Sequence, residues 1–150
     1  MNAAKCLALI MAAVGLCGCA SSASDAKKEI VSVKLNATPR NAGEIAWATL
    51  ASRGDETDIS LRVGGVPFYV TRPVHLYTFI YPGTCASPGA SPSYELNRTI
   101  TTYRLVQGDV WRLSRSAPVP LSTLRSGDYS IVLRTAPADG DYDIFCGDIR

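Results

Sequence analysis

Apolar and polar residues alternate along three separate segments of the chain. Val31, Val33 and Leu35 alternate with polar residues, as do the apolar residues of 59–63 and of 129–134, where only Val132 breaks the pattern. A period of two is typical of a strand with one buried face. Four further segments are rich in Ile, Thr, Tyr, Phe and Val and are predicted as strands. These are residues 44–51, 74–81, 99–106 and 142–146.

Turn-forming residues separate these segments. Residues 53–56, Arg-Gly-Asp-Glu, predict a hairpin turn between strands 44–51 and 57–63. Residues 81–92 contain so many prolines and glycines that we expect a long loop there. We find no sustained helical period. Seven or eight short strands predict an all-β fold, a Greek-key β-sandwich or barrel with immunoglobulin-like architecture, as a single domain over residues 30–150.

The N-terminus departs from this strand pattern. Lys5 precedes an apolar run over residues 6–14, and small residues follow it. This three-part order is typical of a secretory signal peptide. The run is too short to cross about 30 Å of hydrocarbon as a permanent helix. A buried N-terminal helix is the alternative, and it leaves the small residues after the run unexplained.

The end of this segment, Leu16-Cys17-Gly18-Cys19, resembles the lipobox of bacterial lipoproteins. Cys17 departs from the usual small residue at its middle position. The resemblance implies that residues 1–18 are removed and that Cys19 becomes the acylated first residue, anchored to a membrane by several acyl chains. Residues 19–29 are predicted to be a flexible tether. Ala20, where an Asp would signal inner-membrane retention, implies the outer membrane.

The cysteines point to one disulfide. Cys6 and Cys17 leave with the signal peptide and Cys19 carries the lipid, so Cys85 and Cys146 are the pair that remains. In an oxidising compartment we expect these two residues to form a structural bridge. A redox-active pair is the alternative, but a Cys-x-x-Cys setting is missing.

Several segments resemble copper/zinc superoxide dismutases. Residues 78–85, Thr-Phe-Ile-Tyr-Pro-Gly-Thr-Cys, are similar to the family's His-x-His-x-x-Gly-x-Cys stretch, and residues 145–149 are similar to its Ala-Cys-Gly-Val-Ile stretch. Residues 41–45 and 58–67 resemble its opening hairpin. Residues 126–135 resemble its late strand and also chordin-type (CHRD) repeat domains. The resemblance implies a β-sandwich and the same Cys85–Cys146 disulfide.

The metal ligands of that family are missing. Thr78, Ile80 and Arg134 occupy positions where the resemblance implies copper-binding histidines, and the loop after Cys85 contains no histidine. Copper and zinc sites need imidazole, thiolate or carboxylate donors at fixed geometry. We therefore expect no metal and no cofactor. The chain's one histidine, His75, is interpreted as a packed residue.

The family's alternation further predicts which way this strand faces. Tyr77 and Phe79 are expected in the core, whereas Thr78 and Ile80 are expected in the vacated cleft beside Arg134. A permanent cation at that cleft would repel a metal ion and attract a carboxylate.

Other features exclude several function classes. Asp139, Asp141 and Asp143 have the first three spacings of a calcium loop, but Ile144 and Arg150 replace its glycine and its bidentate glutamate. We interpret them as a charged hairpin. The formal net charge of +2 falls to +1 when Lys5 is removed, and the arginines are scattered, so we expect no nucleic-acid binding. Gly-x-Ser-x-Gly and phosphate-loop motifs do not occur.

These observations predict a lipid-anchored, non-catalytic extracytoplasmic β-sandwich that binds a partner in the cell envelope. The partner is expected to be a protein or a small anionic ligand. The alternative is a metal-handling or superoxide-related enzyme with an unconventional site. Metal content of the purified protein and a superoxide assay distinguish the two.

Overall fold

The computed structural model describes residues 28–150. The predicted signal peptide 1–18, the predicted lipidation residue Cys19 and most of the predicted tether lie outside the described residues. Within residues 28–150, no helix has the length and apolar character needed to cross a bilayer.

Strands make up most of the secondary structure. The long strands are β1 (Ile30–Ala37), β2 (Ala46–Arg53), β3 (Glu56–Val63), β4 (Leu76–Thr84), β7 (Trp111–Ala117), β8 (Tyr129–Thr135) and β9 (Asp143–Ile149). The short elements are η1 (Pro39–Asn41), β5 (Ser87–Pro88), β6 (Tyr94–Glu95), α1 (Leu121–Ser126) and η2 (Pro137–Asp139). The all-β prediction is therefore confirmed.

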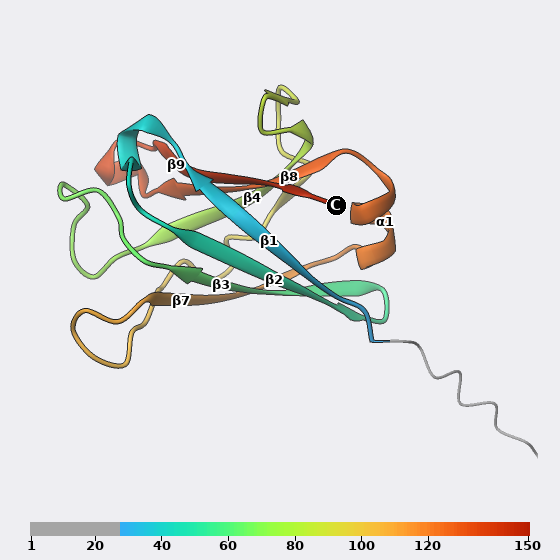
Figure 1. The fold of residues 1–150 in the computed structure, drawn as a ribbon, viewed down its shortest axis with the longest axis horizontal. Helices are drawn as coiled ribbons and strands as arrows, with labels where there is room; N and C mark the ends of the chain where they lie inside the picture. The colour runs from blue at the N-terminus through green and yellow to red at the C-terminus, as the bar shows by residue number, and fades with distance from the viewer. Residues whose placement is uncertain (1–27) are drawn as a thin grey trace, which may run out of the picture.

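The strands form one curled antiparallel sheet, shaped like a half-barrel, in the order β5-β4-β8-β9-β1-β2-β3-β7. β1 joins its two halves, because residues 30–35 pair with β2 and residues 36–37 pair with β9. The half made of β2, β3 and β7 then lies across the core from β4, β8 and β9 (Figure 1).

The alternation seen in the sequence builds this core. Val33 and Leu35 of β1 are buried, as are Ile59, Leu61 and Val63 of β3, whereas the polar residues between them face outward. Burial of a Val, Leu or Ile side chain contributes about 1.5–3 kcal/mol each. α1 adds Leu121 and Leu124 to the same core.

The predicted strand 99–106 is not a strand. Its backbone makes two isolated bridges, His75 with Thr101 and Tyr103 with Arg112. Thr101 and Tyr103 are only two residues apart but bridge to different partners, one just before β4 and one in β7. The segment therefore crosses from the edge of β4 to the edge of β7 instead of running along either strand. β8 then returns beside β4. The spatial order β8-β4-(99–106)-β7 is a Greek key whose second member is irregular.

Two further predictions need correction. β7 was not predicted, although seven of its residues pair with β3 from Thr57–Ala117 to Val63–Trp111. The predicted loop 81–92 is partly regular, because β4 continues through Pro82 and Gly83 to Thr84 and pairs with β5. Pro82 has no N–H to donate, but its carbonyl oxygen accepts a hydrogen bond from the Gly89 N–H at 2.6 Å. The predicted turn 53–56 is confirmed, since Arg53 pairs with Glu56.

The Cys85–Cys146 disulfide is present, with the two Cα atoms 5.8 Å apart. It joins the residue after β4 to β9, which are separated in the sheet by β8. Nearby, the Asp148 carboxylate accepts a hydrogen bond from the Cys85 N–H at 2.7 Å.

Candidate functional site

Thr78, Ile80 and Arg134, where the sequence resemblance implies copper ligands, do not come together as a site. Thr78 and Ile80 are fully buried and point into the core, because they pair with Leu133 and Ile131 on the inner face of β8. The prediction of a cleft surface there is wrong. Phe79 lies on the opposite, outer face but is only 8% exposed, so its predicted burial is confirmed although it lies outside the main core. Tyr77, on the same face, is half-buried. The register between β4 and β8 fixes this orientation, since a shift of one residue would turn Ile80 from the core to the outer face.

Arg134 lies on that outer face, away from Thr78 and Ile80, and its charge is already balanced. Its Nε donates to Asp143 at 2.6 Å, its guanidinium donates to the Tyr81 hydroxyl at 3.1 Å, and it covers the Phe79 ring at 4.8 Å. Partial burial lowers the pKa of Arg134, but Asp143 and Tyr81 outweigh it and raise this pKa above its ordinary value. The anion predicted for Arg134 is thus the chain's own carboxylate.

Asp139, Asp141 and Asp143, which have the spacing of a calcium loop, do not share one site. Asp139 is buried and accepts hydrogen bonds from the backbone and hydroxyl of Thr71, at 3.1 and 3.3 Å, whereas Asp143 pairs with Arg134. Asp141 is exposed. In residues 28–150 no three His, Cys, Asp or Glu side chains gather where they could hold a metal ion.

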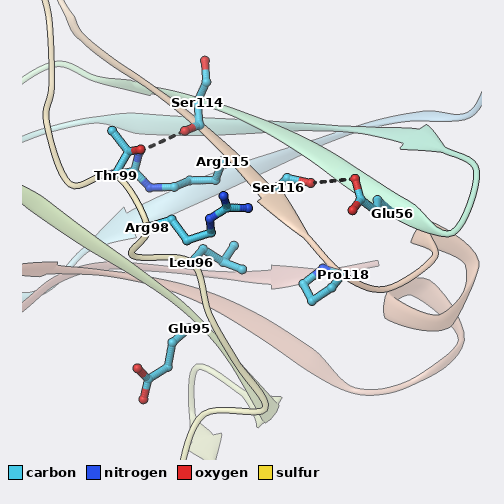
Figure 2. A pocket seen from close by; sticks show the side chains of 9 residues that line it. All are labelled: Glu56, Glu95, Leu96, Arg98, Thr99, Ser114, Arg115, Ser116 and Pro118. Atoms are coloured by element: carbon cyan, nitrogen blue, oxygen red, sulfur yellow. Dashed lines mark hydrogen bonds between the residues drawn. The ribbon is translucent and has the colours of Figure 1, made fainter.

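A pocket of about 510 Å³ opens in the seam between β7 and the chain after β6 (Figure 2). We call it the seam pocket. It lies beside the irregular segment of the Greek key, where no ladder joins β4 to β7. Its lining residues are Glu56, Glu95, Leu96, Arg98, Thr99, Ser114, Arg115, Ser116 and Pro118.

Arg115 is the unusual residue of the seam pocket. It occupies an inward position of β7, between Leu113 and Ala117, and only 7% of it is exposed. Its guanidinium donates to the carbonyl oxygens of Ser114 at 2.9 Å and Leu76 at 3.0 Å, while its Nε has no acceptor among the described residues.

No carboxylate of the described residues forms a salt bridge with Arg115. Burial therefore acts on an unbalanced cation and lowers the pKa of Arg115. A buried charge is costly unless it is paired. The wall of the seam pocket thus carries a positive charge that the described fold leaves without a counter-ion.

Arg98 brings a second cation to the seam pocket. It is exposed, has no salt bridge within residues 28–150, and in Figure 2 its guanidinium points into the space between Arg115 and Ser116. Two carboxylates border the site. Glu56 is engaged by Arg53 and accepts a hydrogen bond from Ser116, whereas Glu95 points away from the two arginines (Figure 2).

A second feature is a group of exposed apolar side chains at one end of the molecule. The register places residues 64–75 and 104–110 at the same end, because both loops flank the Val63–Trp111 pair. Ile30 pairs with Ala51 at the opposite end. Figure 1 shows both loops together at one end of the long axis, far from the start of β1.

The loop tips at this end are strongly exposed. Phe68 is 97% exposed, Leu105 75% and Val106 66%. Behind Phe68, Tyr69 and Tyr142 stack edge to face, with ring centroids 6.4 Å apart. We call Phe68, Tyr69, Leu105, Val106 and Tyr142 the apolar end.

Sequence reasoning missed both features, although a signal for each exists. Trp111, Leu113 and Ala117 alternate with Arg112, Ser114 and Ser116, which predicts β7 if Arg115 is accepted as an inward residue. An arginine at an inward position of a strand is itself a pointer to an unusual environment. The Val-Pro-Phe-Tyr and Leu-Val loop sequences likewise place apolar residues where turns normally expose polar ones.

The chain was also compared with known proteins. No protein-family model matches it, and neither a curated protein nor a solved structure matches it.

Proposed function

We propose that this protein is a lipid-anchored, non-catalytic interaction module of the bacterial cell envelope. Its lipid is carried on Cys19, and it binds a protein partner through the apolar end. The observation that carries the proposal is the exposure of Phe68, Leu105 and Val106 at the end opposite to Ile30. The tethered end would face the membrane, and the apolar end would face away from it.

The composition of the apolar end favours a protein partner. Large apolar residues exposed together at loop tips mark interaction sites. Tyrosine, phenylalanine and arginine are enriched in protein interfaces, and tyrosine and arginine are enriched among the residues that contribute most to binding. Arg40 contributes here, because its guanidinium lies 3.8 Å from the centre of the Tyr142 ring. Polar and aromatic groups are thus arranged side by side.

The Greek-key order β8-β4-(99–106)-β7 supports a relationship to superoxide dismutase-like or CHRD-like domains, which we include in the proposal. In this relationship the sandwich was retained without the metal ligands. The inward-facing Thr78 and Ile80 are compatible with a position that now serves packing.

The anchor is tested with Cys19→Ala. We expect the variant to leave the membrane fraction or to accumulate as an unprocessed precursor, because acylation requires the thiol. Mass spectrometry of the wild type should find acyl groups on an N-terminal Cys19. A soluble, unmodified N-terminus elsewhere contradicts the anchor.

The binding end is tested by cross-linking in intact envelopes, followed by mass spectrometry of the adducts. Phe68→Ser and Leu105→Ser should each reduce the yield of the wild-type protein adduct at least about tenfold. Ile30→Ser is the matched control, because Ile30 is 61% exposed at the opposite end. An adduct that survives both variants contradicts the proposal, as does an adduct with lipid or with a second copy alone.

A further inference from the structure

We propose that the seam pocket binds a small organic monocarboxylate, held directly by Arg98 and balanced electrostatically by the buried Arg115. This inference concerns a different site from the apolar end and does not depend on the proposed function.

The first step is the unbalanced charge. Arg134 and Arg115 are both largely withdrawn from solvent, yet Arg134 has two aspartates within 4.0 Å and Arg115 has none that forms a salt bridge in the described residues. Arg115 donates to two neutral carbonyl groups. An anion in the adjoining pocket would supply the missing counter-charge at short range, where screening by water is reduced.

The second step is the direct contact. Arg98 reaches into the seam pocket from the segment after β6 and is free of salt bridges within residues 28–150 (Figure 2). A guanidinium binds a carboxylate through two parallel N–H···O bonds, a geometry that a single ammonium lacks. The hydroxyl group of Thr99 lines the same space and adds a neutral donor, whereas the hydroxyl of Ser116 already donates to Glu56.

The third step selects a single negative charge. The lining contains two arginines and two glutamates, so its formal charges cancel. Glu56 and Glu95 therefore oppose a dianion such as phosphate more strongly than a monoanion. A carboxylate that lies between Arg98 and Arg115 keeps its distance from Glu95, which points away from them in Figure 2.

The fourth step concerns size and polarity. A pocket of about 510 Å³ lies within the range of about 300–1,000 Å³ that holds small ligands. Leu96 and Pro118 form an apolar part of its wall. A short aliphatic stem can cover these residues while its carboxylate faces the arginines.

The test is titration of the ¹⁵N-labelled full chain, purified in a neutral detergent, with sodium butyrate at constant ionic strength. Amide shifts are followed by NMR. We expect saturable shifts centred on residues 98–99 and 114–116. Butyramide, the neutral analogue of the same shape, should produce no saturable shift there. Inorganic phosphate should bind no more tightly than butyrate.

Two pocket variants and one control sharpen the test. Arg98→Gln and Arg115→Met should each weaken butyrate binding at least about tenfold, whereas Arg150→Gln, which removes an exposed arginine outside the pocket, should leave it unchanged. Arg98 is exposed, so its variant is expected to fold even if Arg115→Met does not. The proposal is overturned if butyrate gives no saturable shift, if butyramide matches it, or if Arg98→Gln binds normally. Tighter binding of phosphate overturns the assignment to a monocarboxylate.

Discussion

The two edges of β4 differ in how their polar groups are satisfied. On one side, β4 pairs with β8 from Leu76 to Pro82, β8 pairs with β9, and the Cys85–Cys146 bridge ties the chain just after β4 to β9. On its other edge, β4 has only the two-residue ladders with β5 and β6, and the segment that leads on to β7 makes single bridges. This region beside β7 is the seam. Each side contains one shielded arginine, Arg134 on the laddered side and Arg115 at the seam.

The two arginines show what the difference means. On the laddered side, Asp143 and Tyr81 raise the pKa of Arg134 despite its partial burial. At the seam, burial lowers the pKa of Arg115, and no carboxylate of the described residues offsets it. The charge of Arg134 is paired within the fold, as expected for a structural residue. An unpaired buried cation beside an open pocket, such as Arg115, instead indicates a candidate ligand site.

The largest expected effect lies on the laddered side. Replacing both Cys85 and Cys146 by Ser should lower the free energy of unfolding by about 2–5 kcal/mol, because the bridge restricts the unfolded chain across a separation of 61 residues. Denaturant unfolding measures the loss, and the wild type in reductant should behave like the double variant. Hydrogen exchange should rise in β4 and β9 before β2 and β3. A loss below about 1 kcal/mol would mean that the ladders alone hold this side.

A smaller effect is expected for Arg134→Met. The variant loses hydrogen bonds to Asp143 and Tyr81 but keeps an apolar stem over Phe79, so we expect a loss of about 1 kcal/mol. Its matched control is Arg150→Met, which breaks the more exposed pair with Asp148 and should change the stability by at most a few tenths of a kcal/mol. Equal values for the two variants would show that Arg134 acts like an ordinary surface residue.

The laddered side was also the more predictable from the sequence. Tyr129, Ile131 and Leu133 alternate with polar neighbours except at Val132, and the two remaining cysteines could be paired by elimination. The face of β4 was not predictable from a family pattern, because Thr78 is a polar residue in the core. Only the register with Leu133 reveals this.

The seam was predicted poorly for a related physical reason. Residues 99–106 have the composition of a strand but lack a continuous neighbouring edge, and composition says nothing about neighbours. β7 has such an edge in β3, yet Arg115 hides its alternation. Strand prediction assumes that charged residues face outward. This assumption fails at β7 because Arg115 is buried. The same residue that prevents prediction of the strand therefore marks the seam pocket.

The smallest expected effect, and the one with a different sign, belongs to Arg115→Met without ligand. The substitution removes an uncompensated buried cation, which favours the variant, and leaves the Leu76 carbonyl without one donor, which costs about 1 kcal/mol. Because these contributions oppose each other, the free energy of unfolding should stay within about 1 kcal/mol of the wild type or rise. Denaturant unfolding in a buffer free of carboxylates measures it beside Arg134→Met. A loss above about 3 kcal/mol would identify Arg115 as a structural brace between β7 and β4, and the contrast between the two arginines would then fail. An unchanged or raised free energy of unfolding means that Arg115 does not stabilise the fold, as expected for a residue whose role is to bind a ligand.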